Sequence, residues 1–400
     1  MTQLRFENIL LKAADLGEEN CLPDIMNNKY IHTPIRVTDR IPAGEGALIG
    51  KGMISTLLPY CIQDGYDRNR KEREFQAAIL ENEYLKATFL PCLGGRLWSL
   101  YDKKTGKELL YRNAVFQPAN LSLRNAWFSG GVEWNVGIKG HNPLTCSPLF
   151  ACRCTNVHGE PVLKMYEYER IRGVVYSVCA TLKEDVLLVH PVIENREAED
   201  KYMYWWSNIA VDEQEGMRIL APTRETFVSY YDETGYVLDY DTLPVMQIKG
   251  MEMPVDVSYP ERIFRSGDFF YNIPKGQKKW VAAVDREGSG LMQFSDDILQ
   301  GRKLFIWGRQ QGGRHWNEWL SDGYKPYVEI QAGLLKTQLE HFIMEKESVI
   351  QWTEGYCGIS GEKDVLHGQD YSAATAHLEA QLGEKYNHLS EGHFEIVHQE

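Results

Sequence analysis

Four glycines surround two proton-transfer groups in residues 128–143, FSGGVEWNVGIKGHNP. Glu133 carries a carboxylate and His141 an imidazole, the side-chain types that most often act as general acids and bases. Glycine permits positive φ angles and close backbone approach but weakens a regular strand, so we expect this stretch to bend around a site. The alternative is that the glycines mark ordinary bulges and that Glu133 lies at the surface.

A second carboxylate occurs in residues 324–338, YKPYVEIQAGLLKTQ. On a strand, Tyr327, Glu329 and Gln331 project to one face, whereas Val328 and Ile330 project to the other. If the apolar pair fills the core, Glu329 faces the opposite side, where its carboxylate can accept a proton and Gln331 offers a hydrogen bond. The alternative is a strand whose polar face meets only solvent.

Aromatic and amide side chains alternate in residues 202–211, YMYWWSNIAV. Because Trp205 and Trp206 are adjacent, they face opposite sides of a strand, and Trp206 shares its face with Asn208. A ring beside an amide suits a sugar, because the ring stacks on the pyranose and the amide binds hydroxyl groups. A cross-strand aromatic contact is the alternative. Trp127 and Trp134 flank the glycine-rich run and offer two further rings.

Three more residues complete the predicted site. Trp316 lies in residues 308–323, GRQQGGRHWNEWLSDG, whose glycines and charges indicate a ligand-binding loop. Arg124 precedes the glycine-rich run, and Arg170 ends MYEYER on an expected neighbouring strand. The candidate catalytic residues are Glu329, His141 and Glu133, and the candidate substrate-binding residues are Trp206, Asn208, Trp134, Arg124, Arg170, Trp316 and Gln331.

Short alternating runs separated by Gly, Asn or Asp dominate residues 76–350. This pattern is typical of antiparallel strands joined by hairpins, and it predicts a large all-β domain of two stacked sheets. Residues 372–389, SAATAHLEAQLGEKYNHL, predict a short C-terminal helix. We expect an N-terminal extension over 1–30, the β domain over 31–355 and a C-terminal extension over 356–400.

The composition excludes several classes of function. A formal net charge of −13 over 400 residues argues against a nucleic-acid partner. The sequence contains no run of about 18 apolar residues, so it predicts no membrane-spanning helix. The N-terminus lacks the features of a secretion signal, and we therefore expect a cytoplasmic protein. The eight cysteines form no CxxC pair, and no GxSxG or HExxH motif occurs. We therefore expect free thiols, no cofactor and no metal site. A bound cation is the alternative that the acidic composition leaves open, although no oxygen-ligand loop of the EF-hand kind occurs.

Four ordered segments carry a family resemblance: PCLGGRLWSLYDKKTGKELLYRN, SGGVEWNVGIKGHNP, YWWSNIAV and YVEIQAGLLKTQLEHFIMEKESVIQWTE. Over about residues 75–370 they resemble an uncharacterised family, domain of unknown function 5107, of the galactose mutarotase-like or aldose 1-epimerase-like superfamily. Members are often fused to tetratricopeptide repeats. The resemblance implies an all-β supersandwich of large stacked antiparallel sheets, with a sugar-binding cleft on a concave face.

The resemblance also implies roles for two residues. In aldose epimerases of that superfamily, a late strand carries a Leu-Glu-Thr-Gln motif whose glutamate is the general base, and YVEIQAG is similar to it at Glu329. Those epimerases use a histidine of a middle strand as general acid, whereas the similar stretch here, YWWSNIAV, has tryptophans. The acid would then be His141 or Glu133.

We therefore expect a carbohydrate-binding, carbohydrate-active protein that acts at the anomeric centre of a mono- or oligosaccharide. Epimerase-like and glycoside hydrolase-like chemistry both need an acid and a base beside the sugar, so the sequence leaves both open. A non-catalytic carbohydrate-binding module is the main alternative. A third is an interaction scaffold whose C-terminal helix docks a partner.

Overall fold

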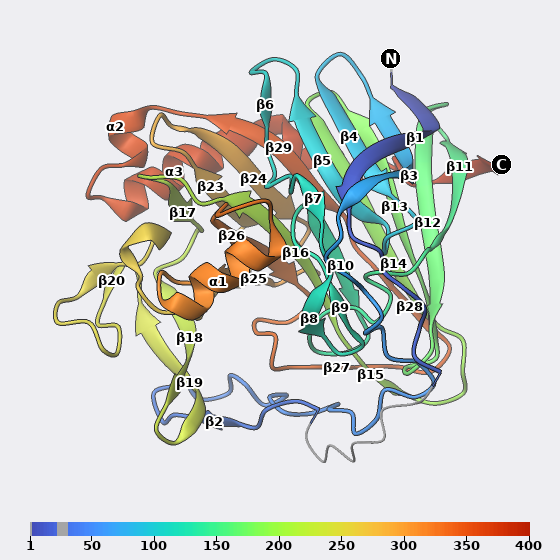
Figure 1. Cartoon of the computed structure of the whole chain (residues 1–400). Helices are drawn as coiled ribbons and strands as arrows, with labels where there is room; N and C mark the ends of the chain where they lie inside the picture. Colours follow the sequence, from blue (N-terminus) through green and yellow to red (C-terminus); the bar gives the residue numbers. More distant parts are fainter. Residues whose placement is uncertain (1, 22–30) are drawn as a thin grey trace.

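Two large sheets form the body of the protein (Figure 1). The computed structural model describes residues 2–21 and 31–400. Within these residues the larger sheet has 14 strands and the second sheet 10. Most neighbours are antiparallel, and the parallel pairs are β1 with β7 and β2 with β19. The predicted all-β supersandwich of large stacked antiparallel sheets is confirmed.

Strands that are neighbours in each sheet are mostly not consecutive in the sequence. The larger sheet runs β2 (Ile35–Val37), β19 (Gly235–Thr242), β18 (Glu225–Asp232), β22 (Gly267–Tyr271), β25 (Gly301–Ile306), β26 (Tyr327–Gly333), β16 (Trp205–Asp212), β10 (Val132–Val136), β5 (Arg96–Asp102), β4 (Leu85–Leu90), β3 (Lys71–Glu81), β1 (Gln3–Ala13) and β7 (Val115–Phe116), with β6 (Lys107–Glu108) on β5. The second runs β17 (Arg218–Leu220), β23 (Lys279–Val284), β24 (Ser289–Ser295), β29 (Glu354–Ser360), β14 (Val186–Asn195), β13 (Val174–Lys183), β12 (Pro161–Glu169), β11 (Phe150–Asn156) and β30 (Ile396–Gln399), with β28 (Ser348–Gln351) on β14.

Short elements connect and cover the sheets. The strand pairs are β15 (Lys201–Met203) with β27 (Phe342–Met344), β20 (Val245–Met246) with β21 (Val255–Asp256), and β8 (Ala119–Ser122) with β9 (Asn125–Trp127). The α-helices are α1 (Gln311–Leu320), α2 (Lys363–Leu366) and α3 (Tyr371–Leu382), and the 3₁₀ helices are η1 (Pro260–Arg262) and η2 (Gly383–Ser390).

Side-chain alternation on three adjacent strands, β10, β16 and β26, separates the core from the polar face. Trp134, Ile209 and Ile330 point into the main hydrophobic core, which they share with residues of the second sheet such as Val178 and Leu187. Residues at odd and even positions of a strand face opposite sides, so the alternate residues lie on the other face of the larger sheet. That face carries the acids of the glycine-rich run and of YVEIQAG.

Residues 308–323 contain a helix, which corrects our prediction of a loop. The helix α1 covers residues 311–320 and lies in front of the larger sheet near β25 and β26 (Figure 1). Its buried residues are Asn317 and Leu320. Gly313 permits close packing at its start, because an added Cβ would lie 2.4 Å from the carbonyl oxygens of Trp307 and Gly308. The glycine at 313 therefore serves close packing of the helix and is not a loop signal.

The C-terminal region adds the predicted short helix. Asp370 caps α3 by accepting hydrogen bonds from the backbone of Ser372 and Ala373. The helix buries Tyr371 and Leu378 against a cluster that includes residues of the second sheet. The strands extend past both predicted boundaries, since β1 lies within residues 1–30 and β30 within residues 356–400, and β29 spans the boundary at 355. Residues 22–30 of the predicted extension lie outside the described residues.

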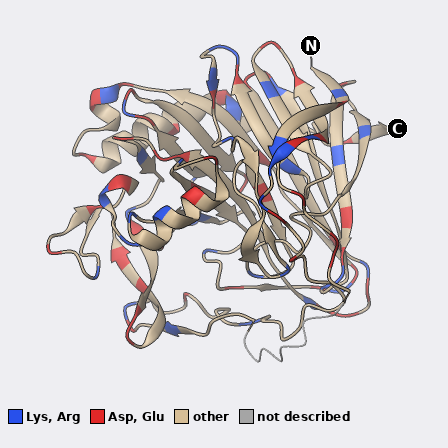
Figure 2. Ribbon diagram, in the orientation of Figure 1, with Lys and Arg blue, Asp and Glu red and all other residues tan. Residues whose placement is uncertain are grey.

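Charged residues of both signs are interspersed over strands and loops (Figure 2). No helix among the described residues is long and apolar enough to cross a membrane.

We predict that Gly333→Ala destabilises the larger sheet. An added Cβ on Gly333 would lie 2.1 Å from the indole of Trp206, so the ring or the strand must move. Overpacking of this kind typically costs about 1–3 kcal/mol of unfolding free energy. Urea unfolding followed by tryptophan fluorescence measures the loss.

The matched control is Gly312→Ala on the exposed part of α1, where an added Cβ meets nothing within 4 Å. Alanine has the higher helix propensity, so this variant should equal or exceed the parent by up to about 1 kcal/mol. Equal stability of Gly333→Ala and the parent would contradict the packing described here.

Candidate active site

Glu133 is a buried carboxylate with three partners. Its Oε2 lies 2.8 Å from His141 Nδ1 and accepts a hydrogen bond of 3.0 Å from Trp127 Nε1. Its Oε1 lies 3.9 Å from the guanidinium of Arg96. The side chain of Glu133 is only 3% exposed, whereas that of His141 is 25% exposed. The imidazole therefore lies between the buried carboxylate and the surface.

Backbone bends allow these partners to meet, as the glycines predicted. Gly130, Gly131, Gly137 and Gly140 all have positive φ. At Gly131 an added Cβ would also lie 2.1 Å from the carbonyl oxygen of Leu97, so only glycine allows β10 to approach β5 this closely. The prediction that this stretch is bent is confirmed, and the alternative of a surface position for Glu133 is wrong.

The surroundings of Glu133 keep it ionised. Burial alone would raise its pKa, but the positive charges of His141 and Arg96 oppose this effect. Together with the hydrogen bonds from His141 and Trp127, they lower the pKa to about 2. A carboxylate with this pKa is a poor proton donor at neutral pH, so Glu133 is better suited to hold its hydrogen-bonding partners in place.

Glu329 lies on the same face of the sheet, two strands away. The strand register places Glu133 opposite Asn208 and Asn208 opposite Gln331, and Glu329 is two residues from Gln331 on β26. Strand spacing then puts the Cα atoms of the two glutamates on the order of 12 Å apart. Gln331 Nε2 donates a hydrogen bond of 3.0 Å to Glu329 Oε2. The predicted common face of Glu329 and Gln331 is confirmed.

Burial raises the pKa of Glu329, which is 4% exposed. The charges of His141 and Lys303 oppose this effect, and the negative charge of Glu133 adds to it. Glu133 and His141 are therefore close enough to Glu329 to affect its charge state. We call these three residues the acid–base cluster.

Among the described residues, the buried polar atoms of this face that lack a hydrogen bond include Oε1 of Glu133, Oδ1 of Asn208 and the hydroxyl group of Tyr327. An unpaired buried acceptor costs about 1–3 kcal/mol, so a donor from water or a bound molecule is expected here. Hydroxyl groups of a ligand would supply such donors.

Indole rings border the acid–base cluster. The ring of Trp127 lies 4.6 Å from that of His141, centroid to centroid. Trp127 also packs with Leu320 of α1, and Trp307 and Trp316 contact the same group. Helix α1 therefore brings Trp316 into the apolar group that contains Trp127, and its predicted role in substrate binding stays a prediction.

Two predicted stacking platforms are closed to a ligand. Trp134 is 1% exposed, lies on the core face and donates a hydrogen bond to the carbonyl oxygen of Gly95. Trp206 occupies the predicted face beside Asn208 but is 1% exposed, because it packs against Gly333 and a cluster that contains Phe270. Side-chain alternation correctly predicted the face of the sheet on which Trp206 lies. It cannot predict which other side chains pack over that face and bury the ring.

The two predicted arginines do not reach the acid–base cluster. Arg124 is buried, and it donates hydrogen bonds to the carbonyl oxygens of Cys61 and Pro143 and pairs with Glu19. Arg170 is exposed, with its guanidinium 5.3 Å from the ring centroid of Tyr60. Both predictions rested on nearness in sequence or on an assumed neighbouring strand, and the side chains join other contacts.

Sequence analysis missed three residues of this site: Arg96, Lys303 and Trp307. Lys303 lies opposite Gln331 in the register and forms an ion pair of 2.7 Å with Asp268. The alternation in KLFIW, residues 303–307, would have placed the lysine and the tryptophan on one face. Arg96 has no such signal, because its position beside Glu133 arises only from folding.

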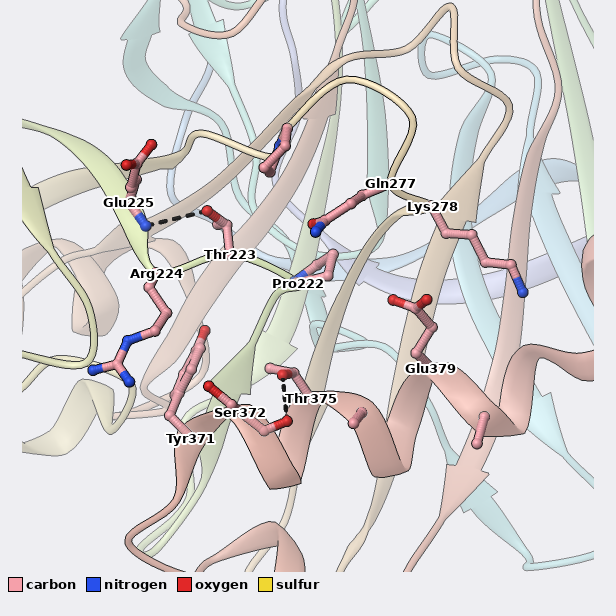
Figure 3. A pocket seen from close by; sticks show the side chains of 13 residues that line it. Pro222, Thr223, Arg224, Glu225, Gln277, Lys278, Tyr371, Ser372, Thr375 and Glu379 are labelled. Carbon is pink, nitrogen blue, oxygen red and sulfur yellow. Dashed lines mark hydrogen bonds between the residues drawn. The ribbon is translucent and has the colours of Figure 1, made fainter. Parts of the chain in front are cut away.

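A hollow of about 790 Å³ lies elsewhere, between α3 and the loops around Thr223 and Gln277 (Figure 3). Its lining includes Arg224, Lys278 and Glu379 but no predicted site residue. Within the described residues, none of the buried unpaired polar atoms belongs to this lining. The chemistry of the acid–base cluster therefore identifies the candidate site better than the size of a hollow does.

Comparisons with known proteins agree with the fold. The family described as Domain of unknown function (DUF5107) matches residues 53–352. A TPR-domain containing protein from Parabacteroides distasonis is 20% identical, with a TM-score of 0.72, and the match covers 90% of this chain and 56% of that one. This chain thus spans a little over half the length of that protein.

Two other solved structures share the fold at lower similarity. A galactose mutarotase-like protein from Clostridium acetobutylicum is 11% identical, with a TM-score of 0.51 and coverage of 72% of this chain and 96% of that one. A candidate aldose 1-epimerase from Klebsiella pneumoniae is also 11% identical, with a TM-score of 0.50 and coverage of 78% and 83%. The fold is therefore galactose mutarotase-like.

We predict that the stability contributed by the Glu133 charge disappears in acid. The unfolded chain has the ordinary glutamate pKa of 4.5 and the folded chain about 2, so between these values the unfolded state binds more protons. The contribution is fully present above pH 4.5 and is lost as the pH falls toward 2. By linkage, about 2 kcal/mol of it is lost between pH 7 and pH 3.

Urea unfolding of the parent and of Glu133→Gln at both pH values measures this loss, since the difference between the two proteins should shrink by that amount. Glu215→Gln, at an exposed position, controls for removal of one carboxylate. A difference between the parent and Glu133→Gln that is the same at pH 7 and pH 3 would contradict the lowered pKa.

Proposed function

This chain belongs to the DUF5107 family, and we propose that it binds a mono- or oligosaccharide over the acid–base cluster and acts at the anomeric centre. The observation that carries this proposal is the opposite pKa shift of two carboxylates on one sheet face, downward for Glu133 and upward for Glu329. Acid–base catalytic sites typically contain two neighbouring titratable groups, of which one has a raised pKa and the other a lowered pKa.

The geometry favours a different role for each member of the cluster. Glu133 stays ionised and orients the imidazole through the 2.8 Å contact between its Oε2 and His141 Nδ1. His141 then acts as the general acid, and Glu329, whose raised pKa makes it a stronger base once ionised, accepts a proton. Glu133 is a positioning residue in this scheme.

These roles support exchange of the two anomers of a sugar. The Glu329 carboxylate removes the proton from the hydroxyl group at C1, the C1–O5 bond breaks, and His141 transfers its proton to O5. The open aldehyde rotates and the reverse steps close the ring on its other face, so no atom is gained or lost. Asn208 and Gln331 would bind hydroxyl groups, and Trp316 would lie against the ring.

Hydrolysis of a glycoside is the less favoured reaction. It would require both carboxylates to act directly on the sugar, as acid and as base or nucleophile. Glu133 Oε2 is held by His141 and Trp127, which leaves one oxygen for such a role. We therefore favour epimerase-like chemistry over hydrolysis.

We also propose a cytoplasmic location. All eight cysteines are free thiols, as expected from the sequence, and free thiols are typical of reducing compartments.

We predict that Glu329→Gln abolishes turnover and leaves binding intact. A screen of mono- and oligosaccharides by thermal shift finds the ligand, because a bound sugar raises the melting temperature. Anomer-resolved NMR then measures the exchange rate of that sugar. Loss of the base should lower the rate about 10²–10⁴-fold, while the thermal shift persists.

Glu194→Gln on the second sheet is the control and should exchange anomers like the parent. A sugar that stabilises the parent without exchange or hydrolysis would instead favour the non-catalytic carbohydrate-binding module. The absence of any stabilising sugar would contradict both functions.

A second prediction separates His141 from Glu133. His141→Asn removes the proton donor, so exchange should fall about 10²–10⁴-fold at every pH. Glu133→Gln keeps the imidazole but replaces the carboxylate that holds its Nδ1, so the exchange rate should fall by less than in His141→Asn while the sugar still binds. An exchange rate in Glu133→Gln equal to that of the parent would contradict the positioning role.

A further inference from the structure

A second cluster of histidine and glutamate side chains lies near the C-terminus, remote in sequence from the acid–base cluster. His388, Glu391 and His393 occur in HLSEGH, residues 388–393, with the spacing His-x₂-Glu-x-His. We propose that these three side chains bind a divalent transition-metal ion of the Zn²⁺ class, and we call them the histidine cluster.

The donor atoms of the histidine cluster converge on one point. Glu391 Oε2 lies 2.7 Å from His388 Nδ1 and 3.1 Å from His393 Nε2. One donor atom from each of the three residues lies within 4.8 Å of the others. Bonds of about 2.0–2.1 Å to a tetrahedral ion require donors roughly 3.4 Å apart, so small side-chain movements suffice.

A carboxylate behind His393 supports metal binding over a simple ion pair. The side chain of His393 is 2% exposed, and its Nδ1 lies 3.2 Å from Glu160 Oε2 while its Nε2 faces Glu391. A metal-bound histidine commonly donates its other ring N–H to a carboxylate. A neutral imidazole has an N–H group on only one of its two nitrogens. If Nδ1 carries the hydrogen, it donates a hydrogen bond to Glu160, and Nε2 is then free to bind a cation on the side that faces Glu391.

The surrounding backbone holds the histidine cluster on the second sheet. Asn156 at the end of β11 donates a hydrogen bond of 2.9 Å to the carbonyl oxygen of His393. The ring of His158 lies 5.4 Å from that of His393, centroid to centroid, in a tilted arrangement, and its Nε2 lies 2.9 Å from the carbonyl oxygen of Glu391. Strand β30 then pairs with β11. These contacts therefore hold the segment that carries the histidine cluster against the β11–β12 hairpin.

The donor set indicates which ions fit. Two imidazoles and one carboxylate suit Zn²⁺ and its first-row neighbours better than Ca²⁺ or Mg²⁺, which prefer oxygen ligands alone. Three protein ligands leave a fourth position for water or for a group of another molecule. Glu391 is 42% exposed in its side chain, so that position can face the surface.

This proposal departs from the expectation of no metal site in the sequence analysis. That expectation rested on the absence of CxxC pairs and of an HExxH motif. The histidine cluster instead lies within the connection from α3 to β30, and His388 belongs to η2. In such an irregular segment, spacing alone does not predict which side chains meet.

Isothermal titration of the full chain with Zn²⁺, after removal of metal by a chelator, tests the proposal. We expect saturation at one ion per chain and a higher melting temperature with Zn²⁺. Glu391→Gln and His388→Asn remove ligands at sites that are not fully buried, and each should weaken Zn²⁺ binding more than tenfold. Glu160→Gln, behind His393, should weaken it about 10–100-fold.

His398→Asn is the matched control, because His398 is 62% exposed and pairs only with Glu400 among the described residues. It should bind Zn²⁺ like the parent. Absence of saturable binding, or equal affinity in Glu391→Gln and the parent, would overturn the proposal. Circular dichroism verifies that each variant is folded. Neither outcome depends on sugar binding, because the acid–base cluster lies on the other sheet.

Discussion

The buried negative charge of Glu133 is the constraint around which the acid–base cluster is organised. A carboxylate removed from water must be paired and hydrogen-bonded, or it would take up a proton. Its partners come from separate parts of the chain: His141 from the turn after β10, Trp127 from β9 and Arg96 from β5. Satisfying one charge therefore fixes the relative positions of three segments.

Arg96 extends this constraint to the backbone. Its guanidinium donates hydrogen bonds to the carbonyl oxygens of Phe128 and Gly130 and to the hydroxyl group of Thr145. The same side chain thus supports both the carboxylate and the glycine-rich bend that leads into β10. The low pKa of Glu133 is a property of this whole arrangement, whereas the raised pKa of Glu329 follows mainly from its burial.

The sequence predicted the parts of this structure that depend on local periodicity. Alternation in YVEIQAG and YWWSNIAV placed Glu329, Gln331 and Asn208 on the polar face, and glycine content indicated the bend near Glu133. The failures concern contacts between distant segments. Alternation cannot show that Trp206 is sealed by neighbouring strands or that Arg124 bonds to carbonyl groups, and a glycine-rich composition concealed the helix α1. The same limit explains why Arg96 and the histidine cluster were missed.

The central claim is that Glu133 and Glu329 share one face but occupy opposite electrostatic environments. NMR of the protein with ¹³C-labelled glutamate carboxyl groups tests it most directly, with Glu133→Gln and Glu329→Gln to assign the two signals. The account predicts that Glu133 titrates near pH 2, that Glu329 titrates above the ordinary glutamate value, and that both signals move when a sugar binds. Two signals that titrate together at the ordinary glutamate pKa, or that ignore every bound sugar, would contradict it.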